Sequence, residues 1–123
     1  MKNIISVFTI VLFLVNNAFG QENGIYTDLA TALKEPLKVK TLELTYMKLS
    51  SFPTEIFKMK NLERLSLEGN KLITTLPKEI GSLTNLKELI LYGLPLTELP
   101  KEIGNLTNLE KLNLTDANLN SLP

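Results

Sequence analysis

The chain has 123 residues, enough for one domain but not for two ordinary ones, and a hydrophobic share of 44% favours a folded protein over a disordered one. Thirteen Lys and Arg residues balance thirteen Asp and Glu residues, so we expect no binding to nucleic acid. The chain contains no His and no Cys, which excludes Ser-His-Asp and Cys-His catalytic systems, the usual zinc sites, iron-sulfur clusters and disulfides. We therefore predict no enzymatic activity, no cofactor and no metal site.

The first 20 residues have the three-part pattern of a secretory signal peptide. Lys2 gives a positive start, an apolar run follows over residues 4–15, and Ala18 and Gly20 place small residues before a cleavage point. The run is shorter than the roughly 20 residues that a transmembrane helix needs. An uncleaved anchor is the alternative, but only one Lys flanks the run. We therefore predict cleavage after Gly20, a secreted, periplasmic or cell-exterior location, and no membrane span in the mature chain.

Residues 21–38 are predicted to form an N-terminal cap that shields the repeats described next. Thr27 is expected to cap a short helix from Ala30 to Leu33, and Pro36 is expected to end it. The expected apolar side of this segment consists of Tyr26, Leu29, Leu33 and Leu37.

The remainder of the chain, 39–123, repeats itself with a period of 23 or 24 residues, which is typical of a solenoid. Three full repeats, 39–61, 62–85 and 86–108, are followed by a partial repeat, 109–123. Apolar residues recur at the first, fourth, sixth and eleventh places, before a proline, and three and six places after it. The second repeat has one extra residue, which we place near Thr74 and Thr75.

Each repeat is expected to contain a short strand and a return path. In segments such as Leu65-Ser66-Leu67 a period of two puts both leucines on one face, and stacked repeats then form a parallel sheet. The return path begins at Pro77 and contains a helical turn that we expect Gly81 to close. The equivalent residues elsewhere are Pro53 and Pro100, and Gly104.

These positions resemble the leucine-rich repeat family, with its pattern LxxLxLxxNxLxxLPxxIxxLxN, over residues 39–123. The resemblance implies an α/β solenoid: a short curved horseshoe with a parallel β-sheet on the concave face and short helical or 3-10 turns on the convex face. The LPxEIGxLTNL style of the repeats is similar to that of short exported bacterial members. The ninth place departs from the pattern, since Met47, Leu94 and Ala117 replace its usual Asn and only Asn70 is expected to satisfy backbone groups in the turn.

The outward positions of the strands form the predicted partner-binding surface, the concave face. The candidates on it are Glu43, Arg64, Glu68, Glu88, Ile90, Tyr92, Lys111 and Asn113. Charges alternate in sign between neighbouring repeats in two columns: Arg64, Glu88 and Lys111, and Lys40, Glu63, Lys87 and Glu110. Such columns indicate either a cross-strand charge ladder or contacts to a partner. Ile90 and Tyr92 are expected to face solvent, either as anchors for a partner or as ordinary exposed strand residues.

We therefore predict a secreted protein-binding module that uses its concave face to bind a protein partner. We predict no cap for the last repeat, so its leucines are expected to be uncovered on the side that faces away from the third repeat. Two interpretations of this end are open: the chain is a truncated product, or the end associates with a partner such as a second copy. A structural or assembly role through the last repeat is the alternative function.

Overall fold

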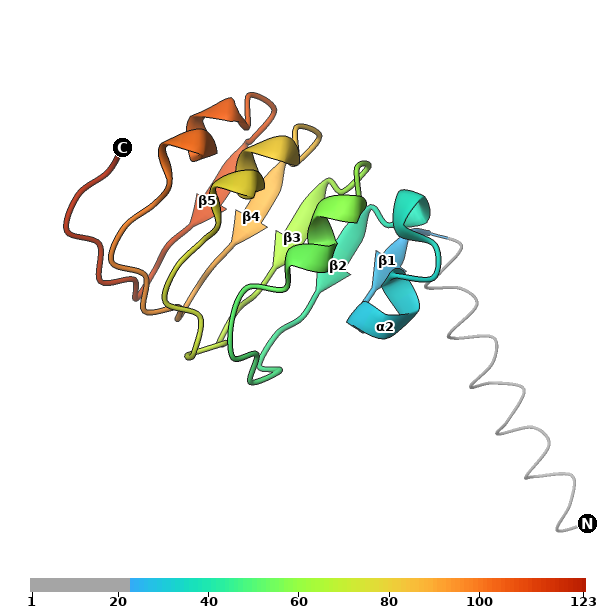
Figure 1. The fold of residues 1–123 in the computed structure, drawn as a ribbon, viewed down its shortest axis with the longest axis horizontal. Helices are drawn as coiled ribbons and strands as arrows, with labels where there is room; N and C mark the ends of the chain where they lie inside the picture. Colours follow the sequence, from blue (N-terminus) through green and yellow to red (C-terminus); the bar gives the residue numbers. More distant parts are fainter. Residues whose placement is uncertain (1–22) are drawn as a thin grey trace, which may run out of the picture.

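One parallel sheet extends through the computed structural model, which describes residues 23–123 (Figure 1). The predicted signal peptide, 1–20, lies outside the described residues. Five strands follow one another in chain order: β1 (Ile25–Tyr26), β2 (Thr41–Glu43), β3 (Arg64–Ser66), β4 (Glu88–Ile90) and β5 (Lys111–Asn113). The predicted parallel sheet of stacked repeats is therefore confirmed.

Short helical turns connect the strands. They comprise α2 (Leu29–Ala32) and the 3-10 segments η1 (Pro36–Lys38), η2 (Thr54–Lys58), η3 (Lys78–Ser82) and η4 (Lys101–Asn105). Pro53, Pro77 and Pro100 stand directly before η2, η3 and η4 with extended backbones. A Glu follows each proline in the first turn, where the positive end of the turn favours a carboxylate.

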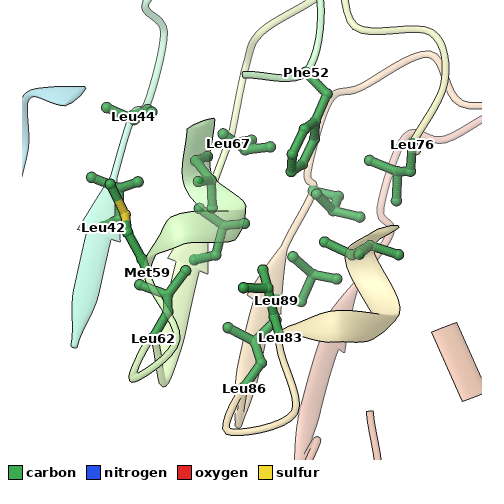
Figure 2. Close-up of a cluster of buried hydrophobic side chains, with 14 of the residues drawn as sticks. Leu42, Leu44, Phe52, Met59, Leu62, Leu67, Leu76, Leu83, Leu86 and Leu89 are labelled. Atoms are coloured by element: carbon green, nitrogen blue, oxygen red, sulfur yellow. The ribbon is translucent and has the colours of Figure 1, made fainter. Parts of the chain in front are cut away.

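The register of the sheet aligns the central leucine of each strand with that of the next. Leu42 pairs with Leu65, Leu65 with Leu89, and Leu89 with Leu112. Leu42, Leu65 and Leu89 are fully buried in one cluster with the apolar residues of the return paths. Figure 2 shows Leu42 and Leu89 in this cluster. The period-two strands thus supply one wall of the core, and the 3-10 segments supply the other.

The N-terminal helix begins differently from the prediction. Its N-cap is Asp28 rather than Thr27, since the Thr31 backbone N–H donates to Asp28 Oδ2 at 2.7 Å. Hydrogen bonds from Thr31 lower the pKa of the Asp28 carboxyl. The predicted apolar side is also wrong at Leu37, which is 62% exposed, whereas Tyr26 is buried.

The extra residue of the second repeat lies earlier than predicted. Ile73 is fully buried in the core, whereas Leu72 is 61% exposed. The Ile73 N–H donates to Asn70 O, three residues back, whereas at the equivalent point of the third repeat the Leu96 N–H donates to Leu94 O, two residues back. The added residue is therefore accommodated between Asn70 and Ile73, not near Thr74 and Thr75.

The prediction that Gly81 and Gly104 end their helical turns is wrong. Both glycines lie inside these turns, Gly81 in η3 and Gly104 in η4. A Cβ at Gly81 would lie 2.7 Å from the backbone oxygen of Glu102, so Gly81 permits the close approach of η3 and η4. A Cβ at Gly104 would meet nothing within 4 Å. The same glycine position therefore has a packing function in one repeat and open space beside it in the next.

This difference yields a matched pair of substitutions. We expect Gly81→Ala to lower the free energy of unfolding by about 1–3 kcal/mol, because the added methyl group must displace backbone in η4. Gly104→Ala is expected to leave stability unchanged or to raise it slightly, since the methyl group enters open space and restricts the unfolded chain. Urea unfolding followed by circular dichroism measures both variants. Equal midpoints would contradict the close approach of η3 and η4.

Candidate binding surface

Each of the two charged columns predicted on the concave face contains an ion pair between neighbouring repeats. Arg64 contacts two carboxylates: its Nη1 bonds Glu88, and its Nε lies 3.4 Å from Glu43 Oε1. In the second column Lys87 Nζ lies 2.8 Å from Glu63 Oε2. The Lys87 ammonium lowers the pKa of the Glu63 carboxyl, and that carboxyl raises the pKa of Lys87. These pairs are at least one-third exposed, so they order the face more than they stabilise the fold.

The predicted exposure of Ile90 is wrong. Ile90 points away from the apolar core, yet only 7% of it is exposed. In the sheet it stands between Ser66, which is also buried, and the half-buried Asn113. Because neighbouring strands lie about 5 Å apart, outward side chains cover one another across the sheet. Ile90 therefore contributes to the packing of the concave face, and it offers little surface to a partner.

The remaining predicted residues lie at graded depths on the same face. Tyr92 and Asn113 are half-buried, and Lys111 is exposed. Asn113 Oδ1 accepts hydrogen bonds from the Thr115 backbone N–H at 3.0 Å and from Thr115 Oγ1 at 2.7 Å. Lys111 forms no ion pair with any residue between 23 and 123. The Arg64–Glu88 pair thus belongs to a short ladder that does not extend to β5.

A residue outside the predicted set, Tyr46, has an unusual backbone conformation in the turn after β2. The eighth place of every repeat has a positive φ: +54° at Tyr46, +73° at Gly69, +72° at Gly93 and +66° at Asp116. Glycine takes this conformation freely and Asp tolerates it, but a bulky side chain rarely adopts it. The glycines at 69 and 93 signal this requirement in the sequence, but nothing there marks Tyr46 as the exception.

The Tyr46 side chain reaches across to the second repeat. Its hydroxyl donates to Glu68 Oε1 at 3.0 Å, and its backbone N–H donates to Glu68 O at 2.8 Å. Its ring covers Gly69, where a Cβ would lie 2.3 Å from the ring carbons. The Gly69 N–H in turn donates to the carbonyl oxygen of Tyr92. We call Tyr46, Glu68 and Tyr92 the tyrosine rim, since all three lie where the strands lead into their turns.

Comparison with known proteins identifies the family. A family model described as a leucine-rich repeat region matches residues 11–123. The chain belongs to the leucine-rich repeat family. A solved leucine-rich repeat protein of Leptospira interrogans is 40% identical, with a TM-score of 0.60. The match covers 80% of this chain and 31% of the Leptospira chain, so this chain spans about a third of the length of that protein.

Asn70 occupies the ninth place of the second repeat, where the leucine-rich repeat pattern has an asparagine. Asn70 is fully buried, and its Nδ2 donates to Leu44 O and Leu67 O, each at 2.7 Å. Its Oδ1 accepts from the Leu49 N–H at 3.2 Å, so one side chain joins two turns. This confirms the predicted role of Asn70.

A second set of asparagines, not predicted from the sequence, lies just before the strands of the leucine-rich repeats. These residues link each repeat to the segment that precedes it. Asn85 and Asn108 each donate through Nδ2 to a carbonyl oxygen of the preceding repeat, and Asn61 donates to Leu37 O in the N-terminal cap segment, all at 2.8–2.9 Å. With Lys40, Glu63 and Lys87 they line an open polar hollow of about 370 Å³. Each of these Asn amides donates one hydrogen bond within the fold, so the Asn side chains serve the stacking of successive segments.

The described residues contain neither a cluster of metal-ligand side chains nor a helix that could cross a membrane. Between residues 23 and 123 no group of three His, Cys, Asp or Glu side chains is arranged to hold a metal ion. No helix in this part of the leucine-rich repeat chain has the length and apolar character that a bilayer crossing requires.

Tyr46 provides a pH-dependent test of the tyrosine rim. The hydrogen bond to Glu68 and the negative charge of that carboxylate raise the pKa of Tyr46 above 10.0. A tyrosine pKa that is raised in the folded state contributes stability below the unfolded pKa, and this contribution is lost as the pH rises through the folded pKa. We expect Glu68→Gln to lower the pKa of Tyr46, as measured by tyrosinate absorbance with Tyr46→Phe as the reference. An unchanged titration would contradict the contact.

Proposed function

We propose that the mature chain is a secreted module that binds a protein partner through its concave face. The leucine-rich repeat fold commonly serves as a protein-interaction module. The observation that supports the proposal is the fixed array on β2, β3 and β4, in which Arg64 holds Glu43 and Glu88 in place. Side chains ordered before binding lose less conformational entropy when a partner arrives. An array of this kind therefore favours binding of a protein surface.

The test compares this face with the opposite side of the solenoid. The exported chain is immobilised and exposed to proteins from the cell exterior, alongside an Arg64→Ala variant and a Lys78→Ala variant. Lys78 is exposed in η3 on the helical side, so it provides the matched control. We expect Lys78→Ala to retain the captured protein and Arg64→Ala to lose most of it, with circular dichroism spectra unchanged. Equal capture by both variants would contradict the proposal.

Secretion has its own support and its own test. The pattern of residues 1–20 favours export, and the 40% identity to a Leptospira protein favours a bacterial source. Expression of the full chain in a bacterial host, followed by N-terminal sequencing of the exported protein, should give Gln21 as the first residue. A chain that stays in the cytoplasm with Met1 in place would contradict this location.

Assembly through the last repeat is a second candidate function. Leu112 is 38% exposed, although its register partner Leu89 is fully buried, and Leu122 is 71% exposed. An apolar edge of this kind favours association with a second copy. Light scattering over a concentration series tests this: Leu119→Lys combined with Leu122→Lys should convert an oligomer to a monomer. A wild-type chain that is monomeric at every concentration would contradict assembly.

A further inference from the structure

The carboxylates of the concave face differ in what neutralises them. Glu43 and Glu88 both contact the Arg64 guanidinium. Glu68 forms no ion pair with the described residues, and the side-chain contact it makes there is with the neutral hydroxyl of Tyr46. That hydroxyl occupies Oε1, which leaves Oε2 without a hydrogen-bond partner among residues 23–123. Glu68 is therefore a carboxylate with unused capacity to accept hydrogen bonds from a cation.

Two aromatic side chains accompany this carboxylate. Tyr46 reaches Glu68 from the preceding repeat and is 62% exposed. Tyr92 stands in the following repeat at the same place as Glu68, and its carbonyl oxygen accepts a hydrogen bond at 2.9 Å from the N–H of Gly69, the residue that the Tyr46 ring covers. Carboxylate oxygens accept charge-assisted hydrogen bonds, and aromatic faces attract cations. The combination is suited to a planar cation, because a guanidinium group can bond the carboxylate and stack on a ring at the same time.

The backbone of Tyr46 gives this combination its geometry. The left-handed conformation at φ +54° directs the side chain toward the second repeat, and Gly69 leaves room for the ring. A glycine at position 46 would adopt the same backbone without strain. Because the eighth place of every repeat takes this conformation, the repeat turn itself holds Tyr46 in it. The fold thus accommodates a strained tyrosine whose exposed ring stands beside an unpaired carboxylate.

We propose that the tyrosine rim is a subsite for an arginine side chain of the protein partner, with Glu68 bonding the guanidinium group and Tyr46 and Tyr92 providing aromatic surface. This inference rests on the proposed function, since it specifies the chemistry of part of that partner. Charge complementarity supports the choice: the other two carboxylates of the face already have a cation, and Glu68 lacks one.

The experiment uses short peptides with a single arginine in a Gly-Ser background, and the same peptides with citrulline, a neutral analogue of similar shape. Binding to the isotope-labelled chain is followed by nuclear magnetic resonance. We expect the arginine peptide to cause saturable chemical-shift changes at Tyr46, Glu68 and Tyr92. The apparent affinity of the citrulline peptide should be at least about tenfold lower. Equal binding of both peptides, or arginine-induced shifts that are absent from the rim, would overturn the proposal.

Two conservative variants separate the subsite from the general negative charge of the chain. Glu68→Gln keeps an acceptor for the Tyr46 hydroxyl but removes the charge, so we expect arginine binding to fall by about tenfold or more. Glu79→Gln is the matched control, because it removes the same charge from an exposed residue of η3 on the helical side, and it should leave arginine binding unchanged. Equal losses in both variants would overturn the subsite, since they would indicate attraction to the overall negative charge.

Failure of the subsite and failure of the proposed function can be told apart. If Glu68→Gln still captures the partner fully while Arg64→Ala does not, the concave face binds a partner and the arginine subsite is wrong. If the arginine peptide binds at the rim and Glu68→Gln removes that binding, the subsite is supported even when no exterior protein is captured.

Discussion

Replacing Leu89 by Ala is expected to lower the free energy of unfolding by about 2–5 kcal/mol. Leu89 is fully buried and stands in register between Leu65 and Leu112, so its truncation leaves a cavity between two neighbouring repeats. Because each repeat is stabilised mainly by its neighbours, the loss also weakens the interfaces on both sides. Urea unfolding monitored by far-ultraviolet circular dichroism measures the effect.

Leu112 provides the control at the same place in the last repeat. It is 38% exposed, so Leu112→Ala removes less buried surface and is expected to cost less than about 2 kcal/mol. If both truncations shifted the unfolding midpoint equally, β5 would have to be covered in solution by something outside the described structure.

Asn70→Ala is expected to lower the free energy of unfolding by about 2–4 kcal/mol, since three backbone groups lose their partner. The Leu49 N–H and the carbonyl oxygens of Leu44 and Leu67 all bond the buried Asn70 side chain. No replacement partner comes with an alanine, so the cost includes the desolvation of these groups. Unfolding in urea again provides the measurement, with the amide resonance of Leu49 as a local reporter.

The matched control is Asn85→Ala. Asn85 precedes β4, whereas Asn70 follows β3, so the two residues lie at opposite ends of the strands. Asn85 is exposed and donates a single hydrogen bond to Lys60 O at 2.9 Å, which water can replace. We expect a cost of about 1 kcal/mol or less. A cost for Asn70→Ala as small as this would show that the turn after β2 does not depend on the Asn70 side chain.

Periodicity predicted the parts of the fold that repeat. Leucines two apart gave the strands, the prolines gave the start of each 3-10 segment, and the pattern at the ninth place singled out Asn70. Alternating charge at equivalent places also predicted cross-strand pairs such as Arg64 with Glu88. These features depend on residue type and spacing alone, so one sequence is enough to find them.

The features that were missed depend on what lies beside a residue in space. Ile90 alternates as an exposed residue should, but side chains on the neighbouring strands bury it. Gly81 resembles a helix terminator, but its small size serves the approach of η4. Tyr46 occupies a backbone conformation that its residue type disfavours, and no spacing rule reveals which bulky residue will do so. The sequence pattern therefore did not reveal the features that depend on contacts between neighbouring repeats or on the backbone dihedral angles of a single residue.

The extra residue of the second repeat lengthens a turn without changing the register of the sheet. Ile73 takes the core position and Leu72 is left outside, while β3 and β4 still pair residue for residue in an unbroken register. Extra chain length is thus absorbed entirely on the solvent side of the turn, where loop closure costs little. The turn at Leu72 is accordingly a natural insertion point, at which a peptide tag or a recognition loop can be displayed without altering the scaffold that presents it.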